Sequence, residues 1–183
     1  MEPFVLTILG EVCHRYFKEM FGIDVDFDKN SPPLMSERPP FKTEVYVYIG
    51  LAGENHQGQL VLGFSKNFVS SSVSKYTQRI KPKAASEFEK SAMCELLNNI
   101  AGLVCNHKQF NDKYSEVSQT LPVFNDTTVE GPVYFTRSEG GQVSFRHGKE
   151  EIFAYISLKK FVSIQIKPEK DDDLLDLSDL DKS

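Results

Sequence analysis

The chain has 183 residues, of which 40% are hydrophobic and 26% charged, and its formal net charge is −5, an ordinary composition for a globular protein. Its apolar runs are too short to cross a membrane, and because the N-terminus has acidic Glu2 and no basic segment, we do not expect a secretory signal. The three cysteines form no CxxC pair, which favours reduced thiols. We therefore expect a cytoplasmic protein with no membrane partner.

The acidity of the chain is concentrated at its C-terminal end. Residues 169–183 contain seven acids and two lysines, a net charge of −5 that equals the charge of the whole chain. Residues 1–168 are consequently neutral, which argues against nucleic acid as a partner. We expect residues 1–168 to form one domain. The acidic tail, 169–183, is expected to be disordered, or to act as a docking peptide with leucine anchors.

The first half of the chain predicts a helix, a loop and a pair of strands. Apolar residues recur at helical spacing from Phe4 to Met20, and Gly22 follows as a stop signal. The four prolines in residues 28–42 predict a loop. Alternating residues in 43–51 and 59–64 predict a hairpin with a loop longer than the tightest type.

The second half predicts a long helix followed by strands. Residues 83–104 have helical periodicity, and Ser86 with Glu89 matches a capping box at the start of this helix. Residues 143–145, 152–158 and 161–166 predict the remaining strands, the last two paired as a closing hairpin. Helices packed on a largely antiparallel sheet place the domain in the α+β class.

One face of the long helix carries Ser91, Glu95, Asn98 and Gly102, because positions i, i+4, i+7 and i+11 share a stripe. A carboxylate and a carboxamide therefore lie one turn apart beside two small residues, opposite an apolar face. Such a stripe is also common on helices that simply face solvent. Asparagine and glycine are poor helix formers, so their presence in mid-helix lowers stability and asks for a reason.

These residues resemble a known signature. The segment Ser91-Ala-Met-Cys-Glu95-Leu-Leu-Asn98-Asn-Ile-Ala-Gly102 is similar to the phosphatase signature of the CheC/CheX/FliY group of chemotaxis proteins. That pattern is Asp or Ser, three residues, Glu, two residues, Asn, then small residues and a downstream proline, for which Pro122 stands at about the expected distance. The resemblance covers most of residues 1–167 and implies a CheX-like or CheC-like domain.

The number of signatures distinguishes members of this group. CheC and FliY usually carry two signatures, whereas CheX carries one. The first helix has Thr7, Glu11 and His14 at the same spacing, with histidine in place of the asparagine. This triplet is either a degenerate second copy or a chance spacing on an amphipathic helix. One intact signature therefore resembles CheX more closely.

The resemblance implies a function for the stripe. The substrate would be the aspartyl phosphate of a CheY-type response regulator, with Asn98 orienting the attacking water and Glu95 pairing with the regulator's lysine. Ser91 and Gly102 would line the contact with the regulator. The chain itself would bind no metal or cofactor, because the Mg²⁺ belongs to the regulator's active site, and it would form a homodimer. The alternative is a non-enzymatic binding module for a response regulator or a flagellar switch protein.

Overall fold

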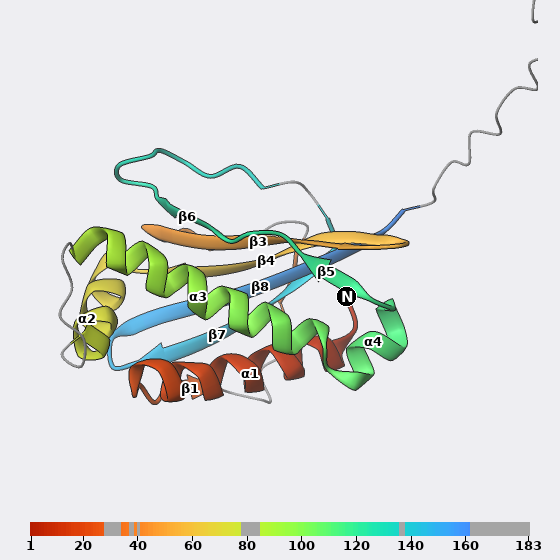
Figure 1. Ribbon diagram of the computed structural model, residues 1–183, viewed down its shortest axis with the longest axis horizontal. Coiled ribbons are helices and arrows are strands. Elements are labelled where there is room, and N and C mark those ends of the chain that lie inside the picture. The colour runs from red at the N-terminus through yellow and green to blue at the C-terminus, as the bar shows by residue number, and fades with distance from the viewer. Residues whose placement is uncertain (28–33, 37–38, 40, 78–84, 136–137, 162–183) are drawn as a thin grey trace, which may run out of the picture.

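The computed structural model describes residues 1–27, 34–36, 39, 41–77, 85–135 and 138–161. In this part of the chain, four helices pack on an antiparallel sheet, and α1 and α3 lie side by side across one face of it (Figure 1). Helices α2 and α4 lie at opposite ends of α3 (Figure 1). The predicted α+β class is confirmed. The predicted tail, 169–183, lies outside the described residues.

Two long helices form the layer below the sheet. Helix α1 spans Pro3–Phe21 and ends as predicted at Gly22, whose φ of 66° is left-handed and whose N–H donates to the Lys18 carbonyl at 2.9 Å. Helix α3 spans Ala85–Cys105. Ser86 therefore lies inside α3 rather than before it, and the predicted capping box is wrong.

The two shorter helices follow the edges of this layer. Helix α2 spans Lys66–Thr77, and helix α4 spans Lys108–Tyr114. The sequence did not predict α4, whose apolar signal is only Phe110 and Tyr114, one turn apart and both buried. No helix in the described ranges is long and apolar enough to cross a membrane.

The sheet has the strand order β1-β7-β8-β4-β3-β5, with β2 also paired to β7 and β6 also paired to β3. Every pairing is antiparallel. The strands are β1 Asp26–Phe27, β2 Leu34–Ser36, β3 Val45–Gly53, β4 His56–Phe64, β5 Val117–Gln119, β6 Val123–Asp126, β7 Gly140–His147 and β8 Glu150–Lys160.

Three strand predictions were wrong. Strand β2 lies in the segment predicted to be a loop. The β3–β4 hairpin has a loop of only two residues, Glu54 and Asn55, because both strands extend further than their alternating patterns. Strand β8 pairs with β7 on one side and β4 on the other, so the hairpin that contains β8 is β7–β8 rather than one with 161–166. Residues 162–166 lie outside the described part of the chain.

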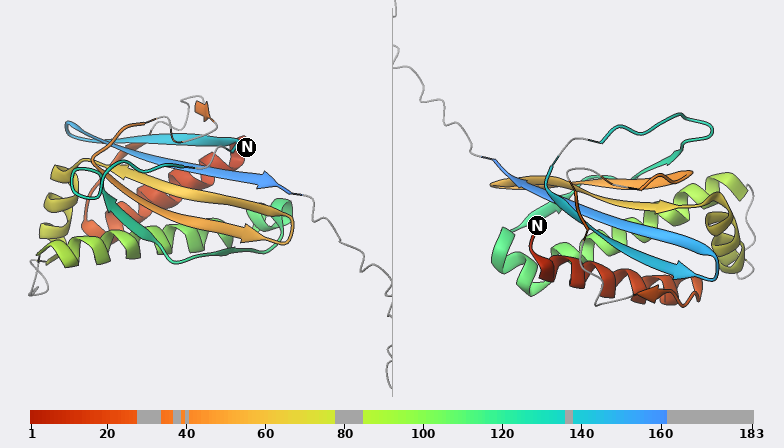
Figure 2. Two further views of the ribbon diagram at one scale, coloured as in Figure 1. Left: turned by 90° about the horizontal axis from the view of Figure 1, so that it is seen from above. Right: turned by 180° about the vertical axis from the view of Figure 1, so that it is seen from behind.

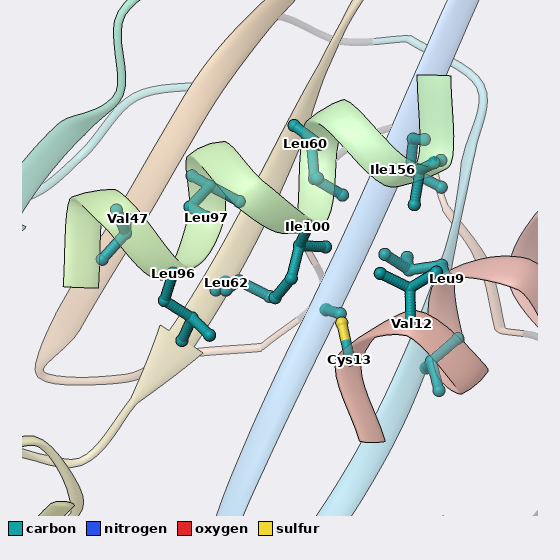
Figure 3. Packing of buried hydrophobic residues seen from close by; sticks show 14 of the residues in the cluster. Leu9, Val12, Cys13, Val47, Leu60, Leu62, Leu96, Leu97, Ile100 and Ile156 are labelled. Atoms are coloured by element: carbon teal, nitrogen blue, oxygen red, sulfur yellow. The ribbon is translucent and has the colours of Figure 1, made fainter. Parts of the chain in front are cut away.

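The core lies between the helices and the sheet. Leu96, Leu97 and Ile100 of α3 point toward the sheet and are fully buried against residues such as Leu62 of β4 (Figure 3). Burying one such side chain contributes about 1.5–3 kcal/mol. The buried face therefore fixes α3 firmly against the sheet, so the opposite face of the helix has a defined orientation.

The other face of the sheet is partly covered by its own loops. Phe41 stacks on Phe153 with ring centroids 4.9 Å apart, and Phe135 meets the edges of Tyr46 and Tyr48. The loop after β6 crosses above the sheet, away from the helices (Figures 1 and 2). Tyr46, Tyr48 and Tyr155 belong to the smaller apolar cluster on this face.

Candidate functional site

Helix α3 presents the predicted stripe on its free face. Ser91, Glu95 and Asn98 are exposed, and Gly102 is partly exposed. The Glu95 carboxylate has no hydrogen-bond or ion-pair partner among the described residues, so it is available to a cation from outside the chain. The stripe is rigid because the residues between its members are the buried ones that anchor α3.

The Asn98 carboxamide, in contrast, is held from the neighbouring strand. Nε2 of Gln119, on β5, donates to Oδ1 of Asn98 at 2.8 Å and to its backbone carbonyl at 3.3 Å. Within the described part of the chain, Nδ2 of Asn98 has no partner. Gln119 was missed by the sequence analysis, since it is separated from Asn98 by 21 positions and carries no local signal.

Gly102 lies next to this contact. A Cβ atom built at Gly102 would have Nε2 of Gln119, 4.0 Å away, as its nearest neighbour. This is an ordinary van der Waals distance, so the fold itself does not require glycine here. Its predicted role in partner contact stays a prediction.

The strand beside the stripe contains a β-bulge. Strand β5 ends at Gln119, opposite Leu51, and β6 begins at Val123, opposite Tyr48. Three residues, 120–122, therefore face only two residues of β3. Such an extra residue changes which side chains point to each face, and bulges occur often at sheet edges next to functional sites. Figure 1 shows β5 and β6 running along α3 at this edge.

The bulge places an apolar side chain in solvent near the stripe. The Cys94 thiol of α3 lies 3.9 Å from the Pro122 carbonyl, to which it donates a weak hydrogen bond. Proline lacks an N–H group, so Pro122 suits a position where the strand pairing is interrupted. The side chain of Leu121, the residue before Pro122, is 85% exposed. Two contacts therefore join α3 to the segment around the bulge: Gln119 with Asn98 before it, and Pro122 with Cys94 within it.

The triplet on the first helix lies elsewhere. Thr7, Glu11 and His14 are all exposed on α1. A ring nitrogen of His14, Nδ1, is 2.9 Å from the Val25 carbonyl, so this side chain is engaged in holding the chain after α1. The interpretation of the triplet as a degenerate copy stays a prediction.

The thiols and the acidic residues form no further centre in the described ranges. No cluster of three or more His, Cys, Asp or Glu that could hold a metal is present there. The three cysteines are free, and burial raises the pKa of Cys105 to about 11. Burial also raises the pKa of Cys13. Neither is poised to act as a nucleophile.

Comparison with known proteins places the fold. No family model matches the chain, and no curated protein matches it. CheX from Desulfovibrio desulfuricans superposes with a TM-score of 0.70 at 16% identity, over 85% of this chain and 99% of that one. A CheC-like protein from Shewanella sp. PV-4 gives 0.70 at 18% identity, over 87% of this chain and 99% of that one. This chain has the CheX fold.

The third similar structure is a complex. The structure of CheX with CheY, BeF₃ and Mg²⁺ from Borrelia burgdorferi gives a TM-score of 0.60 at 16% identity, over 84% of this chain and 97% of that one. The CheX-like or CheC-like fold expected from the signature is therefore confirmed. At these identities the likeness concerns the fold, and the roles of Glu95 and Asn98 stay predictions.

Proposed function

We propose that this chain is a phosphatase that hydrolyses the aspartyl phosphate of a CheY-type response regulator and so terminates chemotaxis signalling. The observation that carries the proposal is the pair Glu95 and Asn98, exposed one turn apart on a helix whose other face is buried, in a CheX fold. The relative from Borrelia burgdorferi in complex with CheY supports this class of partner. BeF₃ in that complex resembles a phosphoryl group in shape.

Asn98 would orient the attacking water. Hydrolysis of an acyl phosphate depends on a water held in line with the phosphorus, because phosphoryl transfer is accelerated mainly by positioning and charge stabilisation. A carboxamide oxygen has two lone pairs, and Gln119 uses one of those on Oδ1 of Asn98. The other can accept from the water, while Nδ2 donates. The amide is neutral, so it does not repel the anionic phosphoryl group.

Glu95 would fix the two proteins in register. Its carboxylate has no partner in the described part of the chain and can form a charge-assisted hydrogen bond with the regulator's lysine. Ser91 and Gly102, at either end of the stripe, leave room for close approach. The Mg²⁺ would be held by the regulator, and this chain would contribute only the helix face.

The test is the decay of a phosphorylated CheY-type regulator from the same organism. Asn98→Ala is expected to slow the catalysed step by about 10²-fold, the loss that follows when a reacting group is no longer held in position. Asn99→Ala, the next residue of the same helix, is the matched control and should retain activity. Glu95→Gln should mainly raise KM.

Two outcomes would contradict this proposal. Full activity in the Asn98→Ala protein would show that Asn98 does not orient the attacking water. Binding of the regulator by the wild-type protein without faster dephosphorylation would instead support a non-enzymatic module for a response regulator or a flagellar switch protein.

A further inference from the structure

Only one end of the Gln119 side-chain amide has a hydrogen-bond partner among the described residues. Its Nε2 donates to Asn98 twice, but its Oε1 is buried and has no hydrogen-bond partner in the described residues. A buried acceptor without a partner lowers stability, because its lost hydration is not replaced. An apolar side chain of the same length would avoid this loss. The contact with Asn98 is the remaining reason for a glutamine here.

The sheet, rather than a free loop, presents this amide to the helix. Gln119 is paired in register with Leu51 of β3. The next residue, Thr120, continues the pairing by donating its N–H to the Gly50 carbonyl at 2.9 Å. A group held on a paired strand positions its neighbour more accurately than one on a loop. The backbone of Asn98 is therefore fixed by α3, and its side chain is held by a residue of a paired strand.

We propose that Gln119 is a positioning residue that sets the orientation of the Asn98 carboxamide. This inference rests on the phosphatase function proposed above. Donation from Nε2 holds Oδ1 of Asn98 on the β5 side and turns Nδ2 away from Gln119, toward the approaching regulator. Accepting this hydrogen bond also polarises the amide, which makes Nδ2 a better donor. Without Gln119, the carboxamide would rotate freely and would present either end to the water.

Two substitutions separate shape from hydrogen bonding. Gln119→Met keeps the length of the side chain, removes the donor and also removes the unpaired Oε1, so the thermal stability should not fall. Gln119→Glu keeps the shape but offers only acceptors at neutral pH, so Nδ2 of Asn98 would turn toward it. Both variants should lower kcat about tenfold at unchanged KM, since a misplaced reacting group costs rate rather than binding.

Gln142→Met is the matched control. Gln142 lies on β7, and β8, β4 and β3 separate that strand from β5. Its Nε2 also donates to a side chain, Oγ of Ser144 at 2.9 Å, and its Oε1 is also buried without a partner in the described residues. The substitution removes the same atoms at a site far from α3. Both kcat and KM should stay at the wild-type values.

The experiment combines single-turnover dephosphorylation with NMR of ¹⁵N-labelled protein. The side-chain NH₂ signals of Asn98, assigned by their loss in Asn98→Asp, should shift and sharpen in Gln119→Met but not in Gln142→Met. Unchanged Asn98 signals, or wild-type kcat in Gln119→Met, would overturn the positioning role. Absence of phosphatase activity in the wild-type protein would count against the proposed function instead, because the NMR comparison is independent of turnover.

A double substitution tests whether Gln119 acts through Asn98. If it does, Asn98→Ala combined with Gln119→Met should be no slower than Asn98→Ala alone. If the two substitutions lower kcat by the product of their separate effects, Gln119 acts on the reaction independently of Asn98, and the inference would be wrong.

Discussion

Thr120 and Gly50 hold each other by two hydrogen bonds across the edge of the sheet. The Thr120 N–H donates to the Gly50 carbonyl, and the Gly50 N–H donates to the Thr120 hydroxyl oxygen, both at 2.9 Å. The hydroxyl thus takes the place that a backbone carbonyl has in a regular ladder. This exchange fixes one side of the bulge, and the Cys94–Pro122 contact fixes the other. Leu121 therefore projects from a rigid support.

We predict that Leu121→Ser raises KM for the phosphorylated regulator about tenfold or more and leaves kcat unchanged. A regulator that covers the stripe would bury this side chain, and burying a leucine contributes about 1.5–3 kcal/mol. Tyr134→Ser is the control, because Tyr134 is 89% exposed but follows β6 on the loop above the other face of the sheet. Steady-state kinetics with both variants decides. Equal changes in KM would contradict a contact at the bulge.

Gly102→Ala should stabilise the protein but weaken binding of the regulator. Alanine in a helix interior is favoured over glycine by about 0.5–1 kcal/mol, and the new Cβ meets only Nε2 of Gln119, at 4.0 Å. Urea unfolding should show this gain, while KM rises if the regulator packs on Gly102. Gly58→Ala is the contrasting substitution, since its Cβ would overlap the Ser157 carbonyl oxygen and must destabilise the sheet. A less stable Gly102→Ala protein would show that the fold needs this glycine.

The Asp126 carboxylate should make stability fall in acid. Burial acts to raise its pKa, but hydrogen bonds from Lys66 and Thr128 outweigh this effect and leave the pKa below its ordinary value. A lowered pKa contributes stability that is fully present above the unfolded pKa, about 3.9, and is lost as the pH falls through the folded pKa. Asp126→Asn should therefore flatten Tm between about pH 5 and pH 2. An unchanged profile would show that Asp126 does not contribute.

The three thiols should differ in reactivity. Cys13 is fully buried and Cys105 is 5% exposed, whereas Cys94 is only partly buried. A thiol reagent at pH 8 should therefore modify Cys94 first in the folded protein, and all three only in urea. Intact-mass spectrometry counts the adducts. Rapid addition of three equivalents to the folded protein would contradict this packing.

The homodimer expected from the resemblance stays a prediction. The chain mass is 20.8 kDa, so light scattering should give twice this value. A monomer mass at every concentration would contradict the expectation.

Hydrophobic periodicity in the sequence predicted the helices and strands that bury one continuous apolar face. The helical spacing from Phe4 to Met20 and the alternation after Thr43 each reflect one buried face, which is a local property of the sequence. The stripe containing Glu95 and Asn98 could be placed for the same reason. Its chemical meaning came from the resemblance, because a carboxylate and an amide on an exposed face are by themselves uninformative.

The features that the sequence did not predict depend on contacts between segments far apart in the chain. Gln119 reaches Asn98 only because β5 pairs with β3 and α3 packs beside both. The bulge is a change of register, and register depends on the partner strand rather than on the residues of the bulge alone. The position of β8 likewise required its two neighbours.

The central position of β8 has a consequence for folding during synthesis. The β3–β4 hairpin and the β7 side of the sheet share no strand until residues 150–160 insert between them. A chain growing from its N-terminus must therefore carry two separate half-sheets, each with an unpaired central edge, until almost all of the described domain has been translated. Such edges invite association with other chains. A nascent chain stalled before Glu150 should need chaperone protection that the finished domain does not.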